Sequence, residues 1–122
     1  MLLRASADNL RRFENCHEGQ GALWCSELLA DYAKRGAGFS FIHDNVIEPG
    51  ASIGEHGHEG EEEIYVIIGG RGTMRIDGVD TPVSAGDVCL TRSGHSHSLV
   101  NGGDGPMRFL VIQTRLGSGL GE

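Results

Sequence analysis

The residues with the clearest chemical potential lie in the segment 56–63, HGHEGEEE. His56 and His58 are separated by one residue, and four glutamates follow within five positions. In an extended strand, alternate side chains lie on one face about 7 Å apart, so these two imidazoles can converge on one metal ion. An H-x-H pair is common by chance. Taken alone, the segment is better interpreted as two exposed loop histidines beside a solvated acidic run.

Further residues recur at fixed separations in two blocks, formed by Gly50, His56, His58, Glu63 and Gly70 in the first and by Gly86, Gly94, His97 and Asn101 in the second. These blocks resemble the paired motifs of the cupin superfamily, G-x5-H-x-H-x3–4-E-x6-G and G-x5-P-x-G-x2-H-x3-N. The agreement of the spacings in order makes the resemblance specific. It spans roughly residues 38–113 and leaves the N-terminal third of the chain uncovered.

The resemblance implies a jelly roll, a double-stranded β-helix made of two packed antiparallel sheets. It also implies a metal ion inside the barrel, held by His56, His58, Glu63 and His97. Three imidazoles and one carboxylate suit one divalent transition-metal ion, which can be Fe, Mn, Ni, Co, Cu or Zn. The sequence does not choose among these metals.

Two glutamates fit the position of the carboxylate ligand in the first motif. Glu62 pairs with Gly69 in the first motif, whereas Glu63 pairs with Gly70. We expect Glu63, because in the family the ligand directly precedes the strand. Neighbouring residues of a strand point to opposite faces, so both glutamates cannot point inward. The remaining glutamates of the run, including Glu61, are expected on the rim or in solvent.

Four further residues are predicted to contact a substrate. Tyr65 and Ile67 share a face with Glu63 in a regular strand, and His43 shares a face with two phenylalanines. A barrel histidine without a ligand role is an equal alternative for His43. Arg92 stands where the second motif has proline; it places a cation near the barrel mouth, although a solvated loop arginine is the more ordinary expectation.

Two other histidines were weighed against these. His95 lies two residues before His97, so an extended backbone brings it near the predicted ion, but the spacing from Gly94 favours His97. His17 lies in an unpatterned segment and receives no role. Asn101 is expected to be a turn or supporting residue rather than a ligand.

The elements that must position these residues are predicted to be strands. Twenty scattered glycines and short apolar runs indicate many turns, which is typical of an all-β protein. From Gly38 onward, strands alternate with turns, and Asp77-Gly78 is predicted to form a tight hairpin bend. At 122 residues the chain is one domain, with an N-terminal arm at 1–37, a barrel at about 38–113 and a flexible tail at 114–122. Within the arm, residues 22–29 fit a strand and residues 26–34 fit a short helix, and we favour a strand that runs into a helical turn.

Charge and cysteine usage restrict the partners and the compartment. The formal charge of −7 argues against binding to nucleic acid or to anionic membrane surfaces. Three cysteines without a CxxC pair indicate free thiols rather than a disulfide framework, and no long apolar stretch opens the chain. We therefore expect a cytoplasmic protein.

The predicted site allows two kinds of catalysis. A redox-active ion with two open positions would support a dioxygenase, and a Lewis-acidic ion would support an isomerase or lyase. The expected substrate is a small polar or acidic organic molecule. The alternative is a non-catalytic small-molecule-binding or sensory cupin, because fold does not fix function. We also expect a homodimer, in which the N-terminal strand crosses to the partner's sheet and covers an edge.

Overall fold

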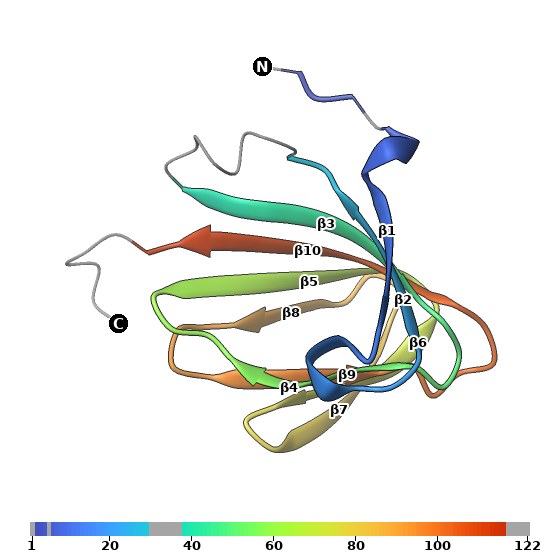
Figure 1. Cartoon of the computed structure of the whole chain (residues 1–122). Coiled ribbons are helices and arrows are strands. Elements are labelled where there is room, and N and C mark those ends of the chain that lie inside the picture. The colour runs from blue at the N-terminus through green and yellow to red at the C-terminus, as the bar shows by residue number, and fades with distance from the viewer. Residues whose placement is uncertain (1, 5, 30–37, 117–122) are drawn as a thin grey trace.

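Two antiparallel sheets face each other in the structure, a computed structural model that describes residues 2–4, 6–29 and 38–116 (Figure 1). The six-stranded sheet has the order β1 (Leu10–Glu14), β2 (Ala22–Glu27), β3 (Phe39–Ile47), β10 (Met107–Arg115), β5 (Glu61–Gly69) and β8 (Val88–Thr91). The four-stranded sheet has the order β4 (Ser52–Gly57), β9 (Ser96–Val100), β6 (Arg71–Ile76) and β7 (Val79–Ser84). This arrangement confirms the predicted all-β jelly-roll fold.

The core lies between the two sheets and is built by alternation along each strand. On β10 the inward residues Met107, Phe109 and Val111 are buried, while Arg108 between them is exposed. Phe109 packs its ring on Tyr65 of β5, with centroids 5.1 Å apart. Period-two patterning therefore fixes which side chains reach the interior, including those of the predicted site.

The hairpin between β6 and β7 turns at the predicted residues. Asp77 has a φ of 49° and Gly78 a φ of 80°, and the flanking Ile76 and Val79 are paired in register. Two consecutive positive φ angles are the signature of a type I′ turn, whose twist matches that of the strands.

The described part of the predicted N-terminal arm adds two strands to the six-stranded sheet. β1 pairs with β2, and β2 pairs with β3 through Leu23 and Ile47. Leu23 and Cys25 belong to the buried core. The predicted strand at 22–29 is confirmed over 22–27, whereas most of the predicted helical turn at 26–34 falls outside the described residues.

A short 3-10 helix, η2 (Cys16–Glu18), joins β1 to β2 and lies directly against β4 (Figure 1). The contact is so close that a Cβ atom added to Gly54 of β4 would lie 1.9 Å from the carbonyl oxygen of His17. Only glycine permits this backbone approach, which brings η2 beside the histidines of β4.

Cys25 and Cys89 are buried and Cys16 is partly buried, and all three carry free thiols. Burial raises the pKa of Cys25 to about 12, so its thiol stays protonated at neutral pH. Among the described residues, no helix has the length and hydropathy needed to cross a membrane.

Candidate metal centre

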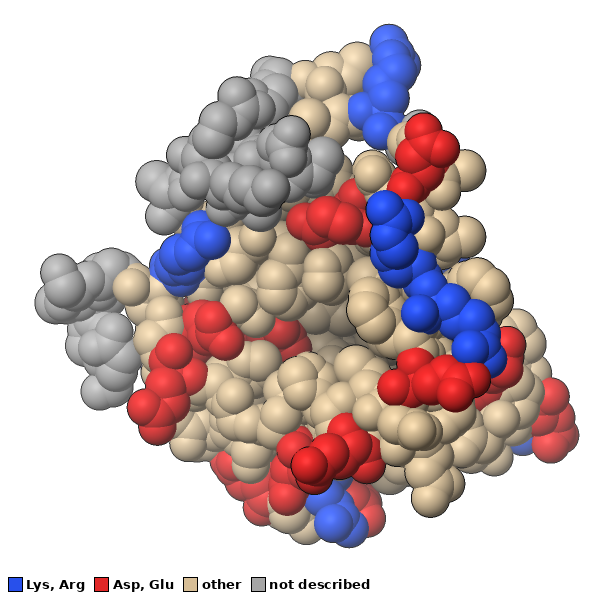
Figure 2. Space-filling model, viewed as in Figure 1, with Lys and Arg blue, Asp and Glu red and all other residues tan. Residues whose placement is uncertain are grey.

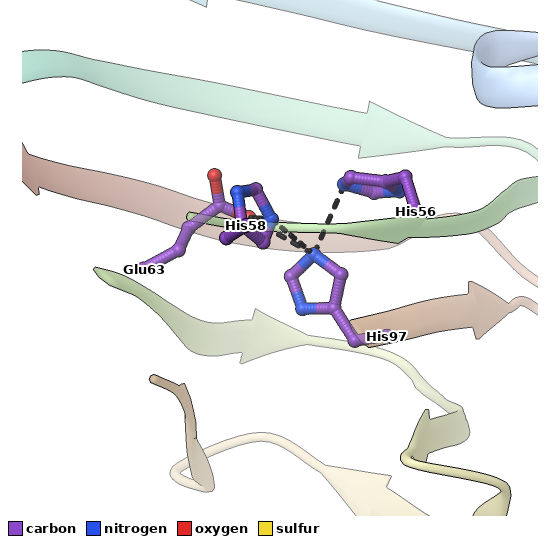
Figure 3. Close-up of side chains that lie close together, drawn as sticks. All are labelled: His56, His58, Glu63 and His97. Atoms are coloured by element: carbon purple, nitrogen blue, oxygen red, sulfur yellow. Dashed lines mark hydrogen bonds and ion pairs between the residues drawn. The ribbon is translucent and has the colours of Figure 1, made fainter. Parts of the chain in front are cut away.

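The four predicted ligands meet between the sheets (Figure 3). His56 lies on β4, His58 follows that strand, Glu63 lies on β5 and His97 on β9. One potential ligand atom from each residue lies within 4.8 Å of the others. The structure thus brings together side chains that are up to 41 positions apart in the chain.

Strand register explains this convergence. β4 and β9 pair so that His56 and His97 are opposite each other. On β5 the alternation turns Glu63 inward, where only 3% of the residue is exposed, while Glu62 is more exposed. Glu63 Oε1 lies 3.1 Å from His97 Nε2 and 3.4 Å from His58 Nε2. Of the two glutamates left open by the motif, Glu63 therefore faces the histidines.

Hydrogen bonds fix the tautomers of two of the three histidines. The Nδ1 atom of His56 donates to the carbonyl oxygen of Gly54 at 2.8 Å, because a carbonyl can only accept. The Nδ1 atom of His58 donates in the same way to Glu61 Oε1 at 2.9 Å. Both rings, when neutral, therefore present the unprotonated Nε2 lone pair toward His97.

The three Nε2 atoms form a tight group around His97. His97 Nε2 lies 3.0 Å from that of His58 and 3.1 Å from that of His56. A single proton on His97 Nε2 cannot satisfy two facing lone pairs and the Glu63 carboxylate together. Two ligand atoms at right angles around an ion, each about 2.1 Å away, would be roughly 3.0 Å apart. The donor set and its spacing therefore fit a bound metal ion.

Burial favours the neutral form of a histidine, which is the form that binds metal ions. His97 is fully buried, and its Nδ1 lies 2.7 Å from Thr91 Oγ1. Burial also lowers the pKa of His56 to about 4, so this imidazole is neutral at physiological pH and its lone pair is free. A neutral imidazole is the form that binds metals.

Glu61 has a supporting role that the sequence analysis missed, since it was expected on the rim. Its Oε1 accepts from His58, and its Oε2 accepts from Gln113 Nε2 at 2.7 Å. A carboxylate behind a ligating histidine orients the ring and raises its basicity. The available signal was its position two residues before Glu63, which places both on one face of β5.

His17 is the second residue that the sequence analysis left without a role. Its ring stacks on His56 with centroids 3.7 Å apart and an interplanar angle of 11°. The backbone around it is strained, because Asn15, His17 and Glu18 all have positive φ angles. This irregular backbone carries no periodic pattern, so spacing could not have revealed the contact.

His95 and Asn101 do not join the group. His95 is about half exposed, and its Nδ1 contacts the carboxylate of Asp77, so the geometry agrees with the preference for His97. Asn101 is fully buried, and its side-chain amide donates to the carbonyl oxygens of Ile47 and Gly105. Asn101 therefore ties a loop to β3, as expected of a supporting residue.

The ligand group opens onto a cavity of about 490 Å³ between the sheets. In Figure 2 the molecule is hollowed at this face, with acidic and basic side chains around the opening. Among the predicted substrate contacts, His43 and Tyr65 line the cavity. Ile67 is buried in the core and Arg92 is exposed, and neither lines the cavity.

Comparison with known proteins agrees with this geometry. A family model described as a cupin domain matches residues 45–113. The chain belongs to the cupin family. The match covers the strands that carry all four ligands, which confirms the resemblance inferred from the motif spacing.

This cupin is similar to several known proteins and solved structures. An oxalate-binding protein from Thermotoga maritima is 39% identical over 112 residues, which cover 92% of each chain. A crystal structure from T. maritima, described as a predicted oxalate decarboxylase, has a TM-score of 0.87 at 38% identity and covers 95% of this chain and 100% of that one. A cupin 2 conserved barrel protein from Salinispora arenicola has a TM-score of 0.72 at 28% identity, covering 97% and 90%.

Proposed function

We propose that this cupin binds one divalent transition-metal ion through His56, His58, Glu63 and His97 and uses it to bind a small carboxylate, for which oxalate is the first candidate. The observation that carries the proposal is the set of Nε2 atoms that face one another at 3.0 and 3.1 Å. Lone pairs held this close are stabilised by a cation between them.

The choice of oxalate is supported by the relatives. The T. maritima protein that is 39% identical over 92% of each chain is described as oxalate-binding. Small dicarboxylates also suit hard or borderline divalent ions, because their oxygens are the ligands that such ions accept. The proposal therefore narrows the small polar or acidic molecule expected from the sequence.

For the activity, we favour decarboxylation, which lies within the lyase class that the sequence predicted. In that reaction the carbon–carbon bond of hydrogen oxalate breaks, carbon dioxide leaves, and a proton binds the remaining carbon to give formate. The bound ion would supply Lewis-acid or redox assistance. The chain itself holds the ring of His58 through Glu61, excludes water behind His97 and orients the Glu63 carboxylate.

The test loads metal-free protein separately with each of the six candidate ions and titrates oxalate by calorimetry. We expect oxalate binding that requires the ion and is lost in His97→Ala, and formate detected by NMR in the presence of the physiological metal. Metal-dependent binding without turnover would support the non-catalytic alternative. Oxalate binding that ignores metal removal would overturn the proposed site.

We also propose that two copies of this cupin associate through the outer face of the six-stranded sheet. The N-terminal strand predicted at 22–29 corresponds to β2, which pairs with β1 and β3 of its own chain, so the contact that we propose lies on another surface. Ile68, Val88 and Leu90 are 45%, 62% and 47% exposed on β5 and on the edge strand β8. Contiguous exposed apolar side chains mark interaction surfaces, and twofold pairing of one surface with itself is the commonest assembly.

A further inference from the structure

Besides the metal group, the cavity lining contains a second polar pair. It lies on β2 and β3, which are three and two strands away from β5, the strand that holds Glu63. Glu27 of β2 and His43 of β3 are directly opposite each other in register, and both line the cavity. We infer that this pair binds a hydroxyl group at the far end of an organic acid whose carboxylate end lies at the metal group. This inference rests on the proposed function and specifies the class of its ligand.

The geometry of the pair leaves hydrogen-bonding capacity unused. Glu27 Oε2 and His43 Nε2 lie 2.9 Å apart. This ion-pair contact does not have hydrogen-bond geometry, and Glu27 Oε2 is a buried oxygen that makes no hydrogen bond in the described part of the chain, although the backbone N–H of Leu29 donates to the Glu27 carboxylate. Buried polar atoms are normally satisfied, so an unpartnered oxygen on a cavity wall indicates a ligand contact. His43 is held in place by stacking on Phe41, with centroids 4.0 Å apart.

The charge state of the pair suits a neutral partner. Burial raises the pKa of Glu27 to about 7 and lowers the pKa of His43, the latter partly offset by the charge of Glu63. At neutral pH a large share of the pair is thus a protonated carboxyl beside a neutral imidazole. The other titratable side chains of the cavity lining include Arg11 and Cys25, which are register partners on β1 and β2 beside the pair, and His56, His58 and Glu63 of the predicted metal group. A hydroxyl group, which both donates and accepts, matches this pair better than a second carboxylate would.

The space between the Glu27–His43 pair and the metal group indicates the size of the middle part of the ligand. His43 is paired with Val111, and Val111 with Tyr65, so two strand spacings, roughly 10 Å, separate the backbones of His43 and Tyr65. Val111 lies between them on β10, and the polar Gln113, which pairs with Phe41 and Glu63, follows two residues further along that strand. The cavity of about 490 Å³ would hold on the order of 16 water molecules at about 30 Å³ each. Oxalate, with two carbons, fills only a small part of that space.

Three probe molecules separate the contributions that the parts of the ligand make to its affinity. Oxalate presents only the chelating end, phenylpyruvate adds an aromatic body, and 4-hydroxyphenylpyruvate adds a hydroxyl group. Each is titrated by calorimetry into metal-loaded wild type, Glu27→Leu and His43→Phe. Ser26→Ala, next to Glu27 and outside the cavity lining, is the matched control. Circular dichroism and metal content confirm that each variant is folded and loaded.

We expect wild type and Ser26→Ala to bind 4-hydroxyphenylpyruvate about tenfold more tightly than phenylpyruvate, as one well-placed hydrogen bond provides. Both cavity variants should bind the two probes equally. If either variant fails to fold, the other gives the result. Absence of the preference in wild type, or its persistence in a folded variant, overturns the inference. The proposed function is tested separately. It fails if oxalate binds to wild type whether or not metal is present.

Discussion

His17 and His56 stack face to face, with ring centroids 3.7 Å apart, although one lies in the segment before the barrel and the other on β4. The stack is possible because η2 approaches β4 at Gly54. The N-terminal segment therefore forms one side of the metal centre. It supports the ring of His56, a predicted ligand whose Nδ1 atom is already held by the Gly54 carbonyl.

Gly54→Ala should disrupt this support. The new methyl group would lie 1.9 Å from the His17 carbonyl oxygen, so η2 must move or the strand must bend. We expect a loss of about 1–3 kcal/mol in the free energy of unfolding, measured by urea denaturation of metal-free protein. Gly57→Ala on the same strand is the control, because the nearest atom to its added Cβ is 3.8 Å away. Equal losses in the two variants would contradict the proposed close contact.

Glu61→Gln should weaken the metal centre without removing a ligand. The substitution replaces the carboxylate that accepts the proton of His58 Nδ1, so the ring becomes less basic and less fixed. We expect a 10–100-fold lower metal affinity by competition with a chelator, with secondary structure unchanged. The exposed Glu59 provides the matched variant, Glu59→Gln, which should bind metal like wild type. An unchanged affinity in Glu61→Gln would assign Glu61 a role in packing alone.

Glu27 should give the stability of metal-free protein a distinct pH dependence. Its pKa is about 7 in the folded state against 4.5 in the unfolded chain, because burial disfavours the charged carboxylate. Between these values the folded state holds a proton that the unfolded state has released, so stability falls as the pH rises. The lowered pKa of His43 acts in the opposite direction below pH 6.5.

Comparison of wild type with Glu27→Gln isolates the contribution of Glu27, since His43 titrates in both proteins. Urea unfolding at a series of pH values provides the two free energies. The difference, wild type minus variant, should fall between about pH 4.5 and 7 and be flat above that range. A difference that rises over the same interval would show that Glu27 ionises more readily in the folded state than in the unfolded one.

The outer face of the sheet gives a prediction about assembly. Val88 and Leu90 point outward from β8, so Val88→Lys with Leu90→Lys should leave the core intact. Burying two ammonium groups in an interface is unfavourable, so the variant should be monomeric where wild type is dimeric. Light scattering coupled to gel filtration measures the mass. A monomeric wild type, or a variant that remains dimeric, would exclude this surface.

The barrel and the grouping of the four predicted ligands were predictable, because the resemblance to the cupin motifs that implies them depends on fixed separations. Glycines at turns and alternation along strands determine where each strand begins and which way Glu63 and His97 point. The same alternation contained the information about Glu61, which the sequence analysis set aside with its acidic neighbours. Hydrogen bonds to His58 and Gln113 distinguish Glu61 from the exposed Glu59, and the bond to His58 depends on the loop after β4.

The contributions of η2 and β2 could not be predicted for a different reason. His17 reaches His56 through a backbone with positive φ angles and a glycine contact, neither of which leaves a period in the sequence. Glu27 faces His43 only because β2 joins the sheet, and the motifs do not extend to that strand. Arg92 is exposed, in agreement with the solvated loop arginine that was the more ordinary of the two expectations for this residue.

The central claim is that His56, His58, Glu63 and His97 hold a metal ion. Its most direct test is elemental analysis of untagged wild type, His97→Ala and His95→Ala, each purified without added metal and then exposed to the six candidate ions. We predict about one ion per chain in wild type and in His95→Ala, whose altered side chain is exposed and paired with Asp77, and almost none in His97→Ala. No uptake by wild type, or equal loss in both variants, would contradict the account.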